Sequence, residues 1–186
     1  WDFLLEIYGN GFIKTFLKQT DKQDDNLIHV VVAFSSKEVL KFVMEFIEKR
    51  LEMTEKDIKN YLKSEGFSCC NLLQRAAFFN QSKSLHKFLW QIFQKYFPEN
   101  LEQFINYKRY GMNLMHVVNS YNNLEICEFT WSKIKELVLP EVRDQANYLK
   151  LKAAKQMSLL QNCQNRHKDR KIIAWIENLM ESPEIN

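Results

Sequence analysis

The chain has 186 residues, 46% hydrophobic and 26% charged, a composition typical of a folded protein rather than a disordered one. Its 26 basic and 23 acidic residues give a net charge of +3 spread along the chain, too small a bias to indicate nucleic-acid binding. With only four Gly and three Pro, it lacks the turns that an all-β protein needs about every 8–12 residues. We therefore expect one nearly all-helical domain.

Four segments of the chain begin alike, which indicates an internal repeat. They are NLIH at 26–29, NLLQ at 71–74, NLMH at 113–116 and SLLQ at 158–161. Successive starts are 45, 42 and 45 residues apart. We expect residues 1–186 to form a single repeat domain, with a partial leading unit at 1–24, units at 25–67, 68–111 and 112–157, and a terminal partial unit at 158–186.

Each unit is expected to hold two helices joined by a tight turn. A short apolar segment follows each start, as VVVAF at 30–34, RAAFF at 75–79 and VVNSY at 117–121. A polar break and a longer amphipathic segment come next, and in the first unit its apolar face holds Val39, Leu40, Val43, Phe46, Ile47 and Leu51. Such short pairs cannot bury their apolar faces alone, so neighbouring pairs should stack on one elongated core.

The connectors between helix pairs, at 52–67 and 98–111, carry a weaker helical pattern. They end in Gly66 and Gly111, which we expect to supply the positive φ of a turn. At the start of the chain, the helix of an earlier unit is predicted from Phe12, Ile13, Phe16 and Leu17. At the end, the second helix of the last unit is predicted from Ile172, Ile173, Trp175, Ile176 and Leu179.

Motifs of enzymes, metal sites and membrane spans are missing from the sequence. It contains no Gly-rich phosphate loop, GxSxG, HExxH or CxxC, and no run of about 18 apolar residues. The cysteines, at 69, 70, 127 and 163, favour a reducing compartment. We therefore expect no enzyme, no cofactor and no metal, an intracellular location in cytoplasm or nucleus, and, since the chain starts at Trp1, a longer parent protein.

Residues 113–126, NLMHVVNSYNNLEI, resemble the ankyrin repeat, whose usual pattern is T-P-L-H-x-A-A-x-x-G-H-x-E-(I/V). The first unit has the same layout, with His29 and Glu38 in register. Asn replaces the family's Thr, Leu replaces its Pro, and Gln74 and Gln161 stand where His is usual. The spacing of 42–45 residues exceeds the family's repeat of about 33, which leaves room for a short helix in place of its β-hairpin. A HEAT-like or other α-solenoid also fits this spacing.

The resemblance implies an all-α solenoid of stacked helix-turn-helix units that binds a protein partner with its concave face. His29 and His116 would then be structural residues that cap and bridge backbone groups. The family's two variable positions map onto Ala33 and Phe34, Phe78 and Phe79, Ser120 and Tyr121, and Asn165 and Arg166. The aromatic residues among them, Phe34, Phe78, Phe79 and Tyr121, form either an outward ladder of anchors or part of the core between units. The connector residues Lys108, Arg109 and Tyr110 mix charge and aromatic rings near a loop tip and are further candidate contacts.

We expect a monomeric intracellular scaffold for protein–protein interaction. Two alternatives stay open. A nucleic-acid-binding solenoid would use the basic residues around Arg109 and Arg166 and would lose affinity steeply with salt. A structural or regulatory segment of a larger channel or receptor would pack on sister chains and form an oligomer.

Overall fold

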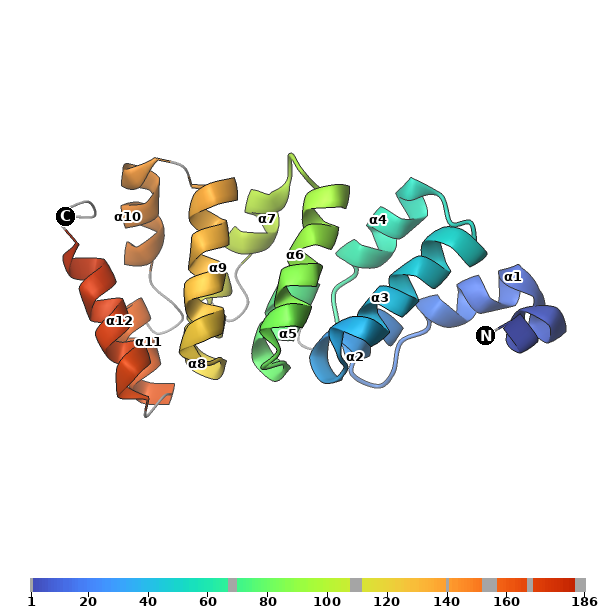
Figure 1. Cartoon of the computed structure of the whole chain (residues 1–186), viewed down its shortest axis with the longest axis horizontal. Coiled ribbons are helices and arrows are strands. Elements are labelled where there is room, and N and C mark those ends of the chain that lie inside the picture. Colours follow the sequence, from blue (N-terminus) through green and yellow to red (C-terminus); the bar gives the residue numbers. More distant parts are fainter. Residues whose placement is uncertain are drawn as a thin grey trace.

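The protein is a row of helices arranged in repeated groups of three (Figure 1). The computed structural model describes residues 2–66, 70–107, 112–139, 141–151, 157–166 and 169–182. Within these ranges the secondary structure is helical, which confirms the all-α prediction. No helix in these ranges has both the length and the apolar character needed to cross a membrane.

Each of the first three groups contains a short inner helix, a longer outer helix and a connector helix, and the last group, among the described residues, contains an inner and an outer helix. The inner helices are α2 (Leu27–Phe34), α5 (Leu72–Phe79), α8 (Leu114–Tyr121) and α11 (Leu159–Arg166). The outer helices are α3 (Lys37–Glu45), which continues into the π-helical turn η1 (Phe46–Arg50), α6 (Lys83–Tyr96), α9 (Leu124–Leu137) and α12 (Arg170–Glu181). The connector helices are α4 (Glu55–Lys63), α7 (Leu101–Asn106) and α10 (Val142–Lys150).

Helices of the same kind stack on one another along the row. The inner helices contact in the order α2, α5, α8 and α11, and the outer helices in the order α3, α6, α9 and α12. The connector helices lie along one edge of this double row, the upper edge in Figure 1. The arrangement is a helical repeat-like fold, and α4 and α7 confirm that the connectors are helical.

The residue that opens each repeated motif is the N-cap of its inner helix. The side-chain oxygens of Asn26, Asn71 and Asn113 accept the backbone N–H three residues later, at 3.4, 3.0 and 3.0 Å. Ser158 Oγ accepts the N–H of Gln161 at 3.1 Å in the same way. Asn and Ser are favoured at this position because they satisfy an otherwise unpaired backbone donor. The repeat in the sequence therefore reflects a repeated helix start.

Asparagines at the other end of the inner helices join neighbouring units. Asn80, the C-cap of α5, donates its side-chain N–H to the carbonyls of Val32 and Ser35 at 3.2 and 3.0 Å. Asn122 occupies the same position after α8 and donates to the carbonyl of Ala77. Because these carbonyls lie at helix C-termini, where intrahelical donors run out, each bond satisfies a backbone group of the preceding unit.

Gly66 is required for close approach, and the prediction that it supplies a positive φ is wrong. Among the described glycines only Gly9 has a positive φ, of 71°, at a kink inside α1 (Asp2–Lys18). A Cβ at position 66 would meet the carboxylate of Asp25 and would lie 2.5 Å from Cδ2 of His29. Gly111, for which the same role was predicted, lies outside the described residues.

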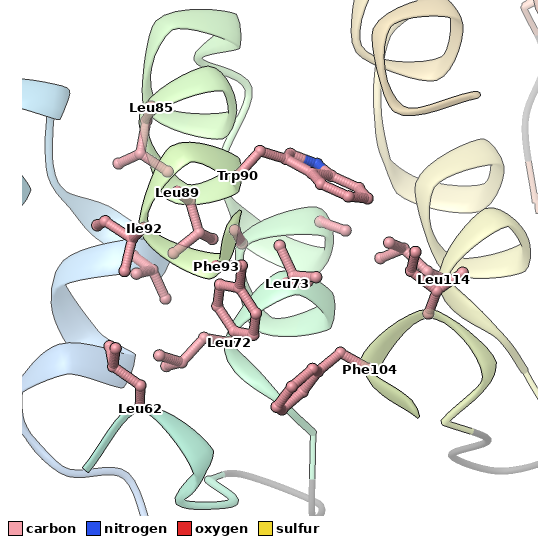
Figure 2. Close-up of a cluster of buried hydrophobic side chains, with 14 of the residues drawn as sticks. Leu62, Leu72, Leu73, Leu85, Leu89, Trp90, Ile92, Phe93, Phe104 and Leu114 are labelled. Atoms are coloured by element: carbon pink, nitrogen blue, oxygen red, sulfur yellow. The ribbon is translucent and has the colours of Figure 1, made fainter. Parts of the chain in front are cut away.

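The core runs between the inner and outer rows along the whole fold. Figure 2 shows its centre, where Leu72 and Leu73 of α5 meet Leu89, Trp90 and Phe93 of α6. Trp131 is 3% exposed and Trp175 packs at the edge of the core, so the recurring tryptophans stabilise the stacking.

The predicted helix at the start of the chain exists, but only half of its predicted apolar residues are buried. Ile13 and Leu17 of α1 pack into the core, with exposed fractions of 2% and 1%. Phe12 and Phe16, one position earlier in each case, are 54% and 47% exposed. This difference follows from geometry, since successive residues of a helix point in directions about 100° apart, so the pair at 12 and 16 and the pair at 13 and 17 face different sides.

Candidate binding surface

The inner helices reach solvent mainly at their last turns. In α5 the residues Leu72–Ala77 are all buried, whereas Phe79 is 42% exposed and Phe78 is partly exposed. In α8 only Tyr121 is partly exposed. Phe34, the last residue of α2, is 64% exposed. Aromatic side chains thus occupy the exposed ends of three successive inner helices.

These rings form one continuous surface, which we call the aromatic row: Phe34, Phe79, Phe78 and Tyr121. The ring centroids of Phe34 and Phe79 are 5.4 Å apart, those of Phe79 and Phe78 are 6.0 Å apart, and those of Phe78 and Tyr121 are 4.7 Å apart. The planes are tilted by 43° to 57°, within the range that aromatic pairs favour. The row therefore crosses from the first unit to the third without a polar interruption.

The two interpretations of these positions each hold for part of the row. Phe34 and Phe79 face solvent, as an aromatic ladder requires. Phe78 and Tyr121 are half-buried and pack against the core. The predicted connector residues Lys108, Arg109 and Tyr110 lie outside the described residues.

A buried ion pair lies next to the two exposed rings of the aromatic row. The guanidinium of Arg75, on α5, pairs with the carboxylate of Asp25, just before α2, and the two side chains are 3% and 1% exposed. The guanidinium carbon lies 4.3 Å from the ring centroid of Phe79 and 5.8 Å from that of Phe34. At these distances a cation is attracted by the ring face, so Arg75 holds both exposed rings while it joins two units.

Arg166, the last residue of α11, ends the aromatic row. Its Nη1 donates to the hydroxyl oxygen of Tyr121 at 2.8 Å, and its guanidinium carbon lies 5.5 Å from the ring centroid. The side chain is exposed. Arg166 therefore places a positive charge beside the third unit's ring.

Sequence reasoning did not include Arg75 and Arg166 among the site residues. Arg75 has no signal in the repeat, since the corresponding residues are Val30, Val117 and Asn162. Arg166 does have one, because it occupies the repeat position of Phe34, Phe79 and Tyr121. The ankyrin resemblance maps a variable position onto Arg166, but only the aromatic residues at these positions were predicted as partner contacts.

His29 joins its inner helix to the following connector. Its Nε2 donates to the carbonyl of Ser64 at 3.0 Å, and its Nδ1 accepts the backbone N–H of Asn26 at 3.3 Å. Burial lowers the pKa of His29, and the nearby positive charge of Arg75 lowers it further, whereas the Ser64 carbonyl and the charge of Asp25 raise it less than burial lowers it. These bonds match the capping and bridging role expected of His29. His116 has the corresponding position, with Nδ1 2.6 Å from the side-chain oxygen of Asn113.

The lowered pKa of His29 predicts a loss of stability in mild acid. The unfolded chain takes up a proton at this residue near pH 6.5, whereas the folded chain does so only at lower pH. The free energy of unfolding contributed by neutral His29 is therefore complete above pH 6.5 and falls as the pH drops toward the folded pKa. Urea titrations between pH 7.5 and 5 should show this decrease.

A natural control is His29→Gln, since Gln74 makes the equivalent bond from Nε2 to the carbonyl of Tyr107 at 2.9 Å. This variant should lose no more than about 1 kcal/mol at pH 7.5, because the bond to the connector is kept. Its stability should decrease less than that of the wild type on acidification. An identical decrease in both proteins would show that His29 does not cause it.

Two clefts among the described residues lie apart from the aromatic row. One of about 360 Å³ is lined by Glu48, Met53, Glu55, Ile58, Lys95 and Tyr96. Another, of about 510 Å³, lies between the end of α9 and the connector helices α7 and α10. No group of three or more His, Cys, Asp or Glu side chains in the described ranges is placed to hold a metal ion. Comparisons of the chain with protein-family models, curated proteins and solved structures found no match.

Proposed function

We propose that the chain is an ankyrin-like repeat scaffold that binds a segment of a protein partner along the aromatic row. The observation that carries this proposal is the run of ring contacts from Phe34 to Tyr121, with Phe34 64% and Phe79 42% exposed. Large exposed aromatic side chains are enriched among residues that dominate binding energy. A partner that covers these rings removes apolar surface from water, which favours association.

Local geometry supports the ankyrin-like part of the proposal. A short helix, a turn of two residues at Ser35 and Ser36, and a longer helix form the unit. Asn26 caps the short helix where the family has Thr, and His29 bonds to the next connector. The connector helices α4, α7 and α10 stand where the family has hairpins. We also propose an intracellular, monomeric protein, to which the buried free thiols of Cys127 and Cys163 are suited.

Affinity capture from a lysate of the source organism tests the binding surface. The wild type is compared with Phe34→Ala/Phe79→Ala, which removes the two exposed rings. We expect a partner protein that the wild type recovers and the double variant loses, because truncating two hot-spot aromatics costs about 2–4 kcal/mol of binding. Helical content should be unchanged, since both rings lie at the surface.

The matched control is Phe42→Ala, which removes a 50%-exposed Phe from the outer helix α3. This control should recover the same protein as the wild type. Equal recovery by all three chains would contradict the proposed surface. Recovery that disappears after nuclease treatment would favour nucleic acid, and an oligomer in size-exclusion chromatography would favour a segment that packs on sister chains.

A further inference from the structure

The inner helices carry charge of one sign only. Their sequences, LIHVVVAF, LLQRAAFF, LMHVVNSY and LLQNCQNR, contain no Asp or Glu. Their charged residues are Arg75 and Arg166. A partner segment that lies along these helices therefore meets aromatic rings, and it meets no carboxylate of the helices themselves.

The two arginines differ in whether their charge is balanced. Arg75 is buried and paired with Asp25, so its charge is neutralised inside the fold. Arg166 is exposed, and none of the ion pairs among the described residues includes it. The hydrogen bond to Tyr121 uses one of the five N–H groups of its guanidinium. The remaining donors can form the paired hydrogen bonds that a carboxylate accepts.

We propose that the partner is an acidic apolar peptide segment, in which a run of apolar side chains covers the aromatic row and a carboxylate beside it binds Arg166. This inference rests on the proposed function. It adds the chemistry of the segment and the direction in which the segment lies along the row. The ring steps of 5.4, 6.0 and 4.7 Å set the length of the apolar run. The guanidinium carbon of Arg166 lies a further 5.5 Å from the Tyr121 ring centroid. An extended chain advances about 3.3 Å per residue, so about six to seven residues separate the end that contacts Phe34 from the carboxylate.

Selection from a display library of linear random peptides tests this inference on the whole chain. Peptides enriched on the wild type should combine aromatic or aliphatic residues with Asp or Glu on one side of them. The variant Arg166→Gln keeps an amide donor for Tyr121 but loses the charge, so the acidic preference should disappear while the apolar preference stays. Arg166→Glu should select Lys or Arg in place of the acid.

The affinity of one enriched synthetic peptide for each variant measures how much Arg166 contributes to binding. Arg166→Gln should weaken it about two- to fivefold, as for an exposed ion pair. Lys87→Glu, on the exposed side of α6, is the control for charge and should bind as the wild type does. Apolar peptides without an acid, or an acidic preference that persists in Arg166→Gln, would overturn the inference and leave the proposed surface intact. Selection of no peptide, or of peptides that Phe34→Ala/Phe79→Ala binds equally well, would overturn both.

Discussion

Replacing Arg75 with Met is expected to lower the free energy of unfolding by about 3–5 kcal/mol. The substitution leaves the carboxylate of Asp25 buried at the junction of the first two units without the charge that compensates it. A buried unpaired charge is costly because the protein interior replaces its hydration poorly. Urea denaturation followed by circular dichroism measures the loss.

Two variants distinguish the cost of an unpaired buried charge from the stability that an ion pair contributes. Arg75→Met/Asp25→Leu removes both charges, and we expect it to recover most of the stability that the single variant loses. Lys83→Met breaks the 2.9 Å ion pair with Glu125, whose side chains are 33% and 62% exposed, and should cost at most about 1 kcal/mol. A single Arg75→Met variant as stable as Lys83→Met would contradict the role assigned to the buried pair.

Phe93→Ala is expected to destabilise the fold by about 3–5 kcal/mol. Phe93 is fully buried on α6 (Figure 2), and its ring lies edge-on to that of Phe104 with centroids 4.8 Å apart. Phe97 contacts both, at 5.5 and 4.9 Å, so the three rings attach the connector helix α7 to the outer helix. Removing Phe93 leaves a cavity that its neighbours cannot fill without leaving these contacts.

Substitutions of different size at position 93 test whether the lost stability comes from this cavity. Phe93→Leu retains most of the buried volume and should lose markedly less stability than Phe93→Ala. Phe42→Ala, on the exposed side of α3, should change the free energy of unfolding by only about 0.5 kcal/mol. If Phe93→Ala and Phe42→Ala unfold at the same urea concentration, the three rings do not stabilise the contact between α7 and α6.

Periodicity in the sequence was enough to predict the helix pairs and the connector helices, because each helix repeats its buried face every 3.6 residues. The resemblance to the ankyrin repeat indicated the residues of the aromatic row, and equivalent positions of a repeat lie at equivalent places in the stack. Whether each ring is exposed could not be predicted, because Phe78 and Phe79 are neighbours in sequence and differ only in which unit they face.

Ion pairs between residues far apart in the sequence could not be predicted for a related reason. Asp25 and Arg75 are 50 positions apart, and no spacing rule joins them before the units are stacked. Gly66 shows the same limit: its sequence context indicates a turn, but its small size is required by the carboxylate of Asp25 and the imidazole of His29, about 40 positions earlier in the same unit. Both features depend on how segments far apart in the sequence pack together in the fold.

The asparagines at the ends of α5 and α8 give the chain a way to change length in evolution. Asn80 and Asn122 both reach back about 45 positions, which is one unit, and both donate to the end of the preceding inner helix. Each unit contacts the preceding unit and presents the same kind of acceptor to the following one. A contact between unlike surfaces of this kind can be repeated along the row. Duplication or loss of one whole unit would recreate the same junction, whereas an insertion of half a unit would separate donors from acceptors. Gene segments of this size are therefore the steps in which related chains should differ in length.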